Sequence, residues 1–550
     1  MLPAGSEGPG EVRVIDGAGC WLTPGFIDLH THYDAEIELA PMLGESLRHG
    51  VTTVVLGSCG LSMAVGEPRD LADMFCRVEG IPRATVEPLF QRVKTWSGPR
   101  EYFEHLSGLA LGPNVAAWLG HSAVRAAAMG LGRSLDAAAR PSPVELGRMA
   151  ALLHEALDAG YLGLSVNTLP WDKMDGESYR SRPTPSVFAG WSEYRALAAI
   201  LRERGSILQG VPNVSTKVNV LLFALLSAGG ILRRRRGLKT TLIALMYAAA
   251  ARGIHRFAGA LTRLTNTLLG GDLRMQALPN PFDMWVDGIE VPLFEEFGAG
   301  TEALHLEDVE ARATLLRDPG YRRRFKRQWR NPILGRAYHR DLGEVRIIAC
   351  PESDLVGKSF AEIGRARGLD PIDAMLDLVA THGKALRWFT VIANDRPDWL
   401  RWIVDHPDAL IGFSDAGAHL RNMAYYNFPL RLLKLVRDGE RAGRPFMTIE
   451  RAVHRLCGEL GEWLGLDAGR LEVGARADLV LIDPEGLDGE LEAMHEAPMP
   501  GFPGLSRLVR RNDRAVRSVL VRGGEVFASG EFIREPSKNG VGCGQLLRQR

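Results

Sequence analysis

Two histidines, His30 and His32, have the residue type and the spacing that most directly suggest chemistry. They follow an apolar run, Gly25 to Leu29, that is typical of a strand. Because side chains alternate along a strand, residues two apart share one face, and both imidazoles can reach one divalent cation. Asp415 ends a second apolar run, 409–414, and its carboxylate could close the same site. The pattern predicts a metal-dependent hydrolase. The competing interpretation is two hydrogen-bonded strand histidines and an aspartate that caps the next helix.

Eight apolar runs predict the strands that must position these residues: 26–32, 51–57, 114–121, 160–166, 205–211, 272–279, 387–393 and 408–414. A ninth run, 345–350, is a surplus strand or part of an insert. Helical patterns such as Pro143 to Ala159 and Ser192 to Arg204 lie between the runs. Continuous apolar strands that alternate with helices indicate a parallel sheet covered on both faces. We therefore expect an α/β fold, a (β/α)8 TIM-like barrel with insertions, in which catalytic residues follow the carboxyl ends of the strands. A doubly wound open sheet is the alternative, but it would not make the first and last strands neighbours.

The chain ends have a different pattern, which indicates a second and smaller unit. Short runs with Gly-rich turns at 474–483 and 516–527 predict antiparallel strands, and Val12 to Trp21 is similar. We expect these ends to form a small flanking β-sandwich domain. The expected division is 1–23 for its N-terminal part, 24–467 for the barrel with an insert around 280–350, 468–533 for its C-terminal part and 534–550 for a tail.

Composition limits the partners and the compartment. The chain holds 66 basic and 66 acidic residues, which gives no reason to expect nucleic acid or an anionic membrane as a partner. Its six cysteines include no CxxC pair, and no signal peptide is visible at Met1, so we expect a cytoplasmic protein. The most apolar segment, Val218 to Leu232, is too short to cross a membrane and is followed by four arginines. We expect it to be a buried helix with a basic C-terminus.

Four blocks of sequence resemble a known family. The block 24–32 resembles the first metal motif of the amidohydrolase superfamily. The block 50–60 is similar, more narrowly, to the D-aminoacylase (N-acyl-D-amino-acid deacylase) branch, and this similarity implies that Cys59 is a metal ligand. A small buried thiol is the alternative. The block 412–418 resembles the catalytic-aspartate motif, and 469–483 resembles the return into the small domain.

The resemblance implies an activity and a cofactor. It implies Zn²⁺ held by His30, His32, Cys59 and Asp415, and hydrolysis of the amide of an N-acyl-D-amino acid or a related small molecule. Asp415 would act as general base and acid while a metal-activated water attacks the amide carbonyl. Two alternatives remain open: a cyclic amide hydrolase of the hydantoin or lactam type, and a degenerate, non-hydrolytic barrel that binds a metabolite or a partner.

The sequence departs from the family at two strand ends. The family places histidines after the fifth and sixth strands, where this chain has Gln209 and Gln276. Glutamine is a weak zinc ligand, so we expect one zinc ion rather than two. The two glutamines would bind substrate or pack inside the barrel. Substrate contacts are also expected from three residues near strand ends: His121, His419 and Arg421, the last as a clamp for a carboxylate. A surface salt bridge is the competing role for Arg421.

The start of the chain also departs from the family. Relatives usually have several strands before the first metal motif, whereas few residues precede Pro24. We expect a truncated N-terminal part of the small domain, whose unpaired edge would favour a homo-oligomer. A start assigned too late in the sequence is the other explanation.

Overall fold

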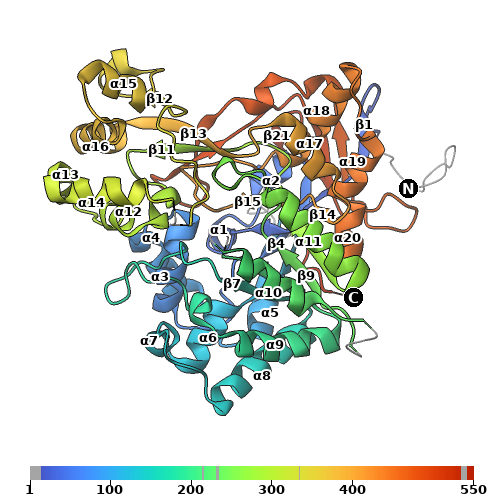
Figure 1. Cartoon of the computed structure of the whole chain (residues 1–550). Coiled ribbons are helices and arrows are strands. Elements are labelled where there is room, and N and C mark those ends of the chain that lie inside the picture. The colour runs from blue at the N-terminus through green and yellow to red at the C-terminus, as the bar shows by residue number, and fades with distance from the viewer. Residues whose placement is uncertain (1–13, 214–215, 231–234, 333–334, 534–541, 550) are drawn as a thin grey trace.

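The computed structural model describes residues 14–213, 216–230, 235–332, 335–533 and 542–549. Helices and parallel strands alternate through most of these residues (Figure 1), so the predicted α/β class is confirmed. Every helix in the described residues is too short or too polar to span a bilayer.

Eleven short strands form the parallel pairings: β2 (Phe26–Asp28), β3 (His30–Thr31), β4 (Val51–Leu56), β5 (Asn114–Ala117), β6 (Leu119–Gly120), β7 (Gly163–Asn167), β8 (Ile207–Val211), β9 (Lys239–Leu242), β10 (Asp272–Gln276), β14 (Ala409–Leu410) and β15 (Phe413–Ala416). The pairings follow a circuit: β2–β4–β5 in one sheet, β6–β7–β8–β9–β10–β14 in another, and β15 with β3. Consecutive pieces such as β2 and β3 belong to one strand interrupted by a single residue. The Leu29 N–H donates to Gly412 O at 2.8 Å across the interruption. The first and last parallel strands are therefore neighbours, as predicted.

The helices that connect these strands are α2 (Gly44–Arg48), α3 (Pro68–Glu79), α4 (Arg83–Val93), α5 (Pro99–Gly108), α6 (His121–Met129), α7 (Leu131–Ser134), α8 (Pro143–Ala159), α9 (Trp191–Arg204), α10 (Lys217–Ser227), α11 (Ile254–Leu268), α17 (Pro397–Asp405), α18 (Phe428–Arg441), α19 (Ile449–Leu456) and α20 (Gly458–Leu464). The helix expected at 143–159 has these bounds because Pro143 begins it and Ser142 forms a capping box with Glu145.

One predicted strand has a different place in the fold, and one strand of the parallel circuit was not predicted. The run 387–393 is a strand, β13 (Arg387–Ala393), but it pairs antiparallel with β11 (Phe282–Asp287) and β12 (Arg346–Ala349) and lies outside the parallel circuit. Its place is taken by β9, which pairs in parallel with β8 and β10 and which the sequence analysis did not identify. An apolar run has the same appearance in both kinds of sheet, and only the partner strand distinguishes them. The sixth strand of the circuit is therefore β9, and Gln276 ends the seventh.

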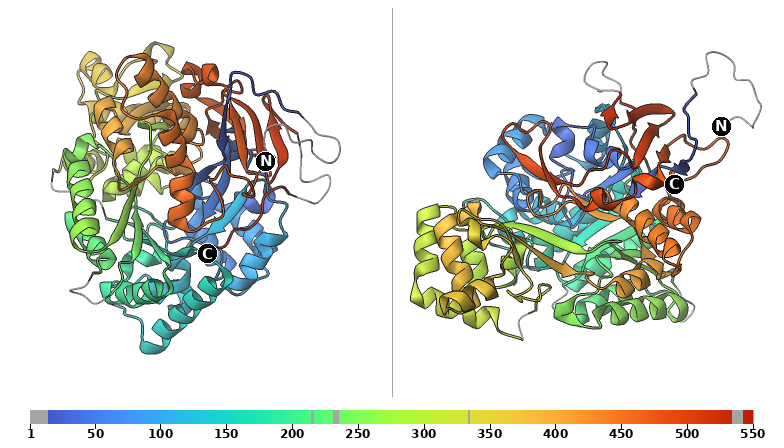
Figure 2. Two further views of the ribbon diagram at one scale, coloured as in Figure 1. Left: turned by 90° about the vertical axis from the view of Figure 1, so that its right-hand side faces the viewer. Right: turned by 90° about the horizontal axis from the view of Figure 1, so that it is seen from above.

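The antiparallel sheet belongs to a unit inserted between β10 and β14. Its helices are α12 (Gly298–Leu304), α13 (Val309–Arg317), α14 (Pro319–Trp329), α15 (Phe360–Arg367) and α16 (Pro371–His382). The views in Figures 1 and 2 draw this unit to one side of the parallel strands. It extends beyond the predicted insert, 280–350, because β13 is one of its strands.

The two ends of the chain share a five-stranded antiparallel sheet. β1 (Trp21–Pro24) pairs with β16 (Leu479–Ile482), and the sheet continues through β19 (Val516–Val521), β20 (Gly524–Ala528) and β21 (Glu531–Phe532). Figure 2 shows the N-terminal strand beside these C-terminal strands. A separate hairpin, β17 (His495–Pro498) and β18 (Ser506–Val509), lies between β16 and β19 in sequence.

The C-terminal residues pack against the parallel strands. Leu546 forms a parallel bridge to Val115, and Leu547 is 3 % exposed within an apolar cluster that also contains Trp118 and Leu460. The predicted tail therefore contributes to the core where it is described.

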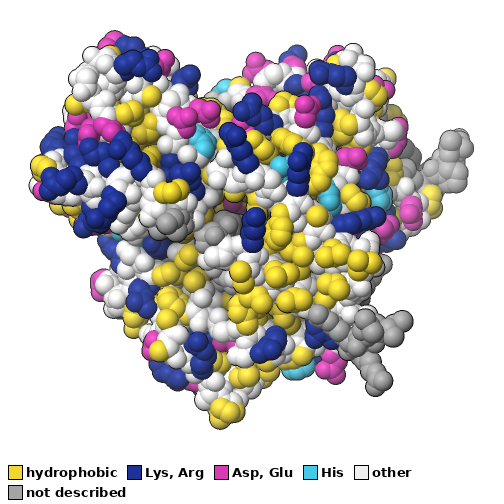
Figure 3. Space-filling view, viewed as in Figure 1, with side chains coloured by type: hydrophobic (Ala, Val, Ile, Leu, Met, Phe, Trp, Pro, Cys, Tyr) yellow, Lys and Arg dark blue, Asp and Glu magenta, His cyan; other side chains and the backbone are white. Residues whose placement is uncertain are grey.

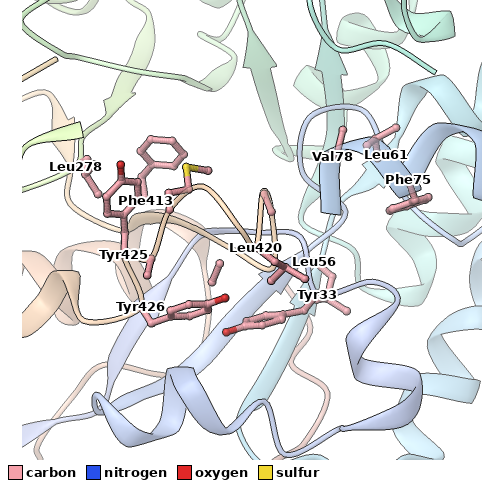
Figure 4. Close-up of a cluster of buried hydrophobic side chains, with 14 of the residues drawn as sticks. Tyr33, Leu56, Leu61, Phe75, Val78, Leu278, Phe413, Leu420, Tyr425 and Tyr426 are labelled. Atoms are coloured by element: carbon pink, nitrogen blue, oxygen red, sulfur yellow. The ribbon is translucent and has the colours of Figure 1, made fainter. Parts of the chain in front are cut away.

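A buried ion pair joins the hairpin to the loop that follows the first strand. Arg507 on β18 donates to both carboxylate oxygens of Glu36 at 2.8 Å, and both side chains are at most 2 % exposed. Glu36 begins α1 (Glu36–Leu39), three residues after Tyr33. Figure 4 shows Tyr33 facing Tyr426, with ring centroids 6.5 Å apart, among apolar side chains of the same region.

Replacing Arg507 with alanine should lower the free energy of unfolding by about 3–5 kcal/mol, because Glu36 would remain buried without a partner. The control is Arg514→Ala, which removes a pair with Asp488 whose arginine is 69 % exposed and should cost less than about 1 kcal/mol. Chemical denaturation of both variants measures the difference. Equal costs would contradict the special role of the buried pair.

Candidate metal centre

Four of the predicted residues converge at one point. His30 lies on β3, His32 and Cys59 follow β3 and β4, and Asp415 lies on β15. Nitrogen and sulfur atoms of His30, His32 and Cys59 lie within 4.8 Å of one another. Asp415 Oδ1 is 3.3 Å from His32 Nε2 and 3.6 Å from His30 Nε2. Two imidazoles, a thiol and a carboxylate from three strand ends therefore face a common space.

The backbone at Cys59 and Asp415 is unusual. Both residues have a positive φ, 56° and 58°, in a region that non-glycine residues seldom adopt and that is over-represented at functional sites. Gly417 follows Asp415 with φ 91°, and a Cβ there would lie 2.2 Å from His32 O. Glycine is therefore required for the Asp415 turn to approach the first strand so closely.

Gln276 fixes the orientation of His30. Its Oε1 lies 2.8 Å from His30 Nδ1. An amide oxygen only accepts hydrogen bonds, so Nδ1 carries the proton and Nε2 presents its lone pair toward Cys59 Sγ, 3.2 Å away. Phe413 packs edge-on against the same ring at 5.0 Å. The ring is thereby held in the tautomer that a cation at Nε2 requires.

Gln209 acts on the other side of the site. Its Oε1 accepts a hydrogen bond from the Cys59 N–H at 3.2 Å. The Nε2 atoms of Gln209 and Gln276 are buried and have no hydrogen-bond partner among the described residues. Each glutamine thus contacts a predicted ligand residue and keeps one donor free. Sequence reasoning placed both at strand ends but missed these contacts, which join strands far apart in the chain.

Burial and charge set the protonation of the cluster. Burial lowers the pKa of His30 to about 4. Burial alone would raise the pKa of Asp415, but the hydrogen bond and charge of His32 outweigh it and hold that pKa at about 2. Burial raises the pKa of the Cys59 thiol, and the charge of Asp415 adds to the effect. His30 is therefore neutral and Asp415 ionised at neutral pH, the forms in which both can hold a cation.

A cavity of about 560 Å³, a size suited to a small molecule, is linked to the cluster through two of its lining residues. Asp172 and His419 line it, and the charges of both act on His32 and Asp415. A second cavity, of about 1020 Å³, shares Arg77 and Glu290 with the first and continues toward the inserted unit.

Asp172 was not identified from the sequence. Burial raises the pKa of its carboxyl to about 6, and it accepts a hydrogen bond from Asn167 Nδ2. It follows β7, and its position after a parallel strand was the available signal.

The other predicted substrate-binding residues differ in what surrounds them. His419 lines the cavity, and burial lowers its pKa to about 4. His121 is fully buried, with Nδ1 3.0 Å from Ser186 Oγ and Nε2 2.9 Å from Glu193 Oε1. It is absent from the described lining of both cavities, so nothing in the geometry favours a substrate contact by His121.

Arg421 lines the cavity but is paired with the protein's own carboxylates. Its Nη2 lies 3.0 Å from Asp287 Oδ2, and its Nη1 lies 2.5 Å from Glu496 Oε1. The competing role of a salt bridge describes this residue better than a free carboxylate clamp.

Comparisons with known proteins give relatives along the whole chain. An uncharacterized protein of Mycobacterium tuberculosis is 49 % identical over 542 residues, which cover 98 % of this chain and 88 % of the relative. The N-acyl-D-glutamate deacylase of Alcaligenes xylosoxydans xylosoxydans is 27 % identical over 97 % of this chain and 88 % of its own length. No protein-family model matches the chain.

Among solved structures, the N-acyl-D-glutamate deacylase of Bordetella bronchiseptica superposes with a TM-score of 0.61 at 23 % identity, covering 97 % of this chain and 90 % of that one. That structure is a complex with zinc and a phosphonate inhibitor that mimics the tetrahedral intermediate of its reaction. At this identity, the likeness is one of fold.

Proposed function

We propose that the chain is a member of the amidohydrolase superfamily, in its D-aminoacylase branch, and that it hydrolyses N-acyl-D-amino acids or related amides. One observation carries the proposal: His30, His32, Cys59 and Asp415 converge at strand ends as a metal-binding set. Asp172 and His419, whose charges act on this set, line a cavity large enough for such a substrate. The named relatives suggest amide hydrolysis as the reaction, and the cluster has the residue types that bind a metal ion and transfer a proton.

The proposed architecture is a (β/α)8 TIM-like barrel with a small flanking β domain built from both chain ends. The circuit of parallel pairings from β2 to β15 supports the barrel, and the pairing of β1 with β16 supports the shared domain. In such a barrel the site lies at the carboxyl ends of the strands, which is where the converging residues stand.

The four residues fit one zinc ion. Imidazole and thiolate are the ligands that zinc prefers, and a carboxylate completes a tetrahedral set. The free lone pair of His30 Nε2 and the absence of a described partner for His32 Nδ1 agree with a site built for a cation. We propose that His30, His32, Cys59 and Asp415 hold Zn²⁺. When bound, this ion would supply Lewis-acid polarisation of the amide carbonyl and would lower the pKa of a water molecule.

The proton transfers are assigned to Asp415. Its carboxylate, ionised at neutral pH, accepts a proton from the attacking water as the oxygen bonds to the amide carbon. The same carboxyl then gives the proton to the departing nitrogen as the carbon–nitrogen bond breaks. The products are a carboxylate and a free amino acid. His32, 3.3 Å from Asp415 Oδ1, keeps the carboxylate aligned between these steps.

We also propose a substrate contact from His419, which lines the cavity. Gln209 and Gln276 are absent from the described lining, but each contacts a proposed ligand residue and has a free amide donor, so we propose that they too bind substrate. Asp172 joins them as a buried carboxylate that can accept a hydrogen bond from the substrate. We propose a cytoplasmic location, as expected from six cysteines that include no CxxC pair.

A substrate panel tests the function. The full chain, loaded with zinc, is expected to release free amino acid from N-acetyl-D-amino acids at least about tenfold faster than from the L forms. Release is measured by amine detection, with hydantoin and dihydrouracil as cyclic alternatives. Ring opening without release from any N-acetyl compound would replace the deacylase with the cyclic amide hydrolase. No turnover by the zinc-loaded protein would support the degenerate barrel instead.

A further inference from the structure

The segment from Gly205 to Gly271 has an unusual charge distribution. It contains no Asp or Glu, although acidic and basic residues are equally frequent in the whole chain. Its basic residues are Lys217, Arg233, Arg234, Arg235, Arg236, Lys239, Arg252, Arg256 and Arg263. The prediction that no anionic membrane is a partner rested on the neutral total, which conceals this local excess of positive charge.

Two helices of this segment expose large apolar side chains. On α10, Val218, Leu221 and Leu225 are 64 %, 44 % and 38 % exposed, at the i, i+3 and i+7 spacing of one helix face. On α11, Leu264 and Leu268 are 45 % and 73 % exposed, one turn apart. These five make up a third of the large exposed hydrophobic residues in the described part of the chain, although the two helices are a small fraction of it. The run 218–232, expected to be buried, is therefore buried on one side only where it is described.

The two apolar stripes lie beside each other. Lys217 Nζ, at the start of α10, lies 5.3 Å from the centroid of the Phe257 ring near the start of α11. At the other end, the N–H of Gly229 donates to Leu269 O at 2.9 Å. The helices are thus parallel neighbours (Figure 1), and Figure 3 shows hydrophobic side chains gathered over the region where they lie.

Exposed basic side chains come from the same segment, and one of them, Arg256, lies over the Trp399 ring of α17 at 4.3 Å. Lys217, Arg235, Arg236, Arg252, Arg256 and Arg263 are all exposed. A carboxylate from another element approaches one of them: Asp408 Oδ2 lies 3.7 Å from Arg263 Nη1. The surface defined by α10, α11 and these basic residues is called the basic apolar face below.

We propose that the basic apolar face docks on the surface of an anionic lipid bilayer. Exposed leucines enter the boundary between headgroups and acyl chains, and the exposed arginines and lysine of the same segment contact anionic headgroups. A second copy of the chain is a poorer occupant, because its own basic residues would be brought against these. A nucleic acid would match the charge but would leave the apolar stripes without a function. The helices lie along the membrane surface and do not cross it.

Co-sedimentation of the full chain with vesicles tests the proposal. Extruded vesicles of phosphatidylglycerol and phosphatidylcholine are compared with vesicles of phosphatidylcholine alone, at about 0.05 M and about 0.5 M salt. The chain should sediment with the anionic vesicles at low salt, and both high salt and the neutral lipid should reduce the bound fraction.

A matched pair of variants identifies the surface. The double variant Leu221→Gln, Leu264→Gln removes one leucine from each stripe and should weaken partitioning about tenfold or more. The control, Val144→Gln with Val309→Gln, changes residues 68 % and 66 % exposed on α8 and α13 and should bind as the wild type does. Circular dichroism confirms that both variants fold.

Three outcomes would overturn the proposal. The wild type could fail to prefer anionic vesicles over neutral ones, or the control could lose as much binding as the leucine variant. In the third, the wild type forms a dimer that the leucine variant dissociates while no vesicle binding occurs, which assigns the face to a second copy.

Discussion

Alanine in place of Asp415 is expected to lower kcat/KM for deacylation by about 10³-fold or more. The change removes the group proposed to transfer the proton and one proposed ligand of the metal, and general acid–base catalysis alone contributes about 10²–10⁴-fold. His30→Ala should have an effect of the same size. The loss should reside mainly in kcat, because Asp415 acts on the water and the departing nitrogen and not on the bound ground state.

Two companion variants sharpen this experiment. Asp415→Asn keeps the shape of the side chain and tolerates its left-handed backbone, φ 58°, but cannot accept the proton at the former carboxylate. It should therefore retain the fold and lose turnover. Asp398→Ala removes a carboxylate that is 94 % exposed and should leave kcat unchanged. Wild-type turnover by the alanine or asparagine variant at position 415 would refute the role assigned to this residue.

Serine in place of Cys59 is expected to weaken zinc retention by about 100-fold or more. A thiolate is among the strongest zinc ligands, and a serine hydroxyl at neutral pH is not a comparable one. The zinc content of the purified protein, followed during dialysis against a chelator, measures the effect. Activity should fall in parallel and recover in part when zinc is added in excess.

The matched control is Cys350→Ser, which changes a partly exposed cysteine at the end of β12, in the inserted unit. Its zinc content should equal that of the wild type. If Cys59→Ser also retains zinc as the wild type does, Cys59 is not a ligand, and the thiol only fills space beside His30.

Much of the parallel sheet could be predicted because its strands are continuous apolar runs that end at polar residues. The errors have a common cause. β9 begins with Lys239, Thr240 and Thr241, a polar sequence that does not resemble a buried strand, although all three pair with β10. The run 387–393 resembles one but pairs antiparallel. Which strand pairs with which is decided by packing across the whole molecule, and a local pattern carries little of that information.

Some residues of the site could be predicted from the sequence, whereas their contacts with distant residues could not. The HxH spacing and the carboxylate at a strand end follow from strand geometry, and the resemblance added Cys59. The partners of Arg421 could not be predicted, because Asp287 and Glu496 come from distant parts of the chain. The same holds for the contact of Gln276 with His30, which joins residues 246 positions apart.

The packing of the C-terminal residues has a consequence for synthesis. Val115 acquires its partner Leu546, and the apolar cluster acquires Leu547, only after more than 400 further residues have been added. At a ribosomal rate of roughly 5–20 residues per second, that interval lasts roughly 20–90 s. During this time the early strands leave the ribosome with one side uncovered. A chaperone that binds nascent chains would need to protect the first quarter of the polypeptide throughout this interval.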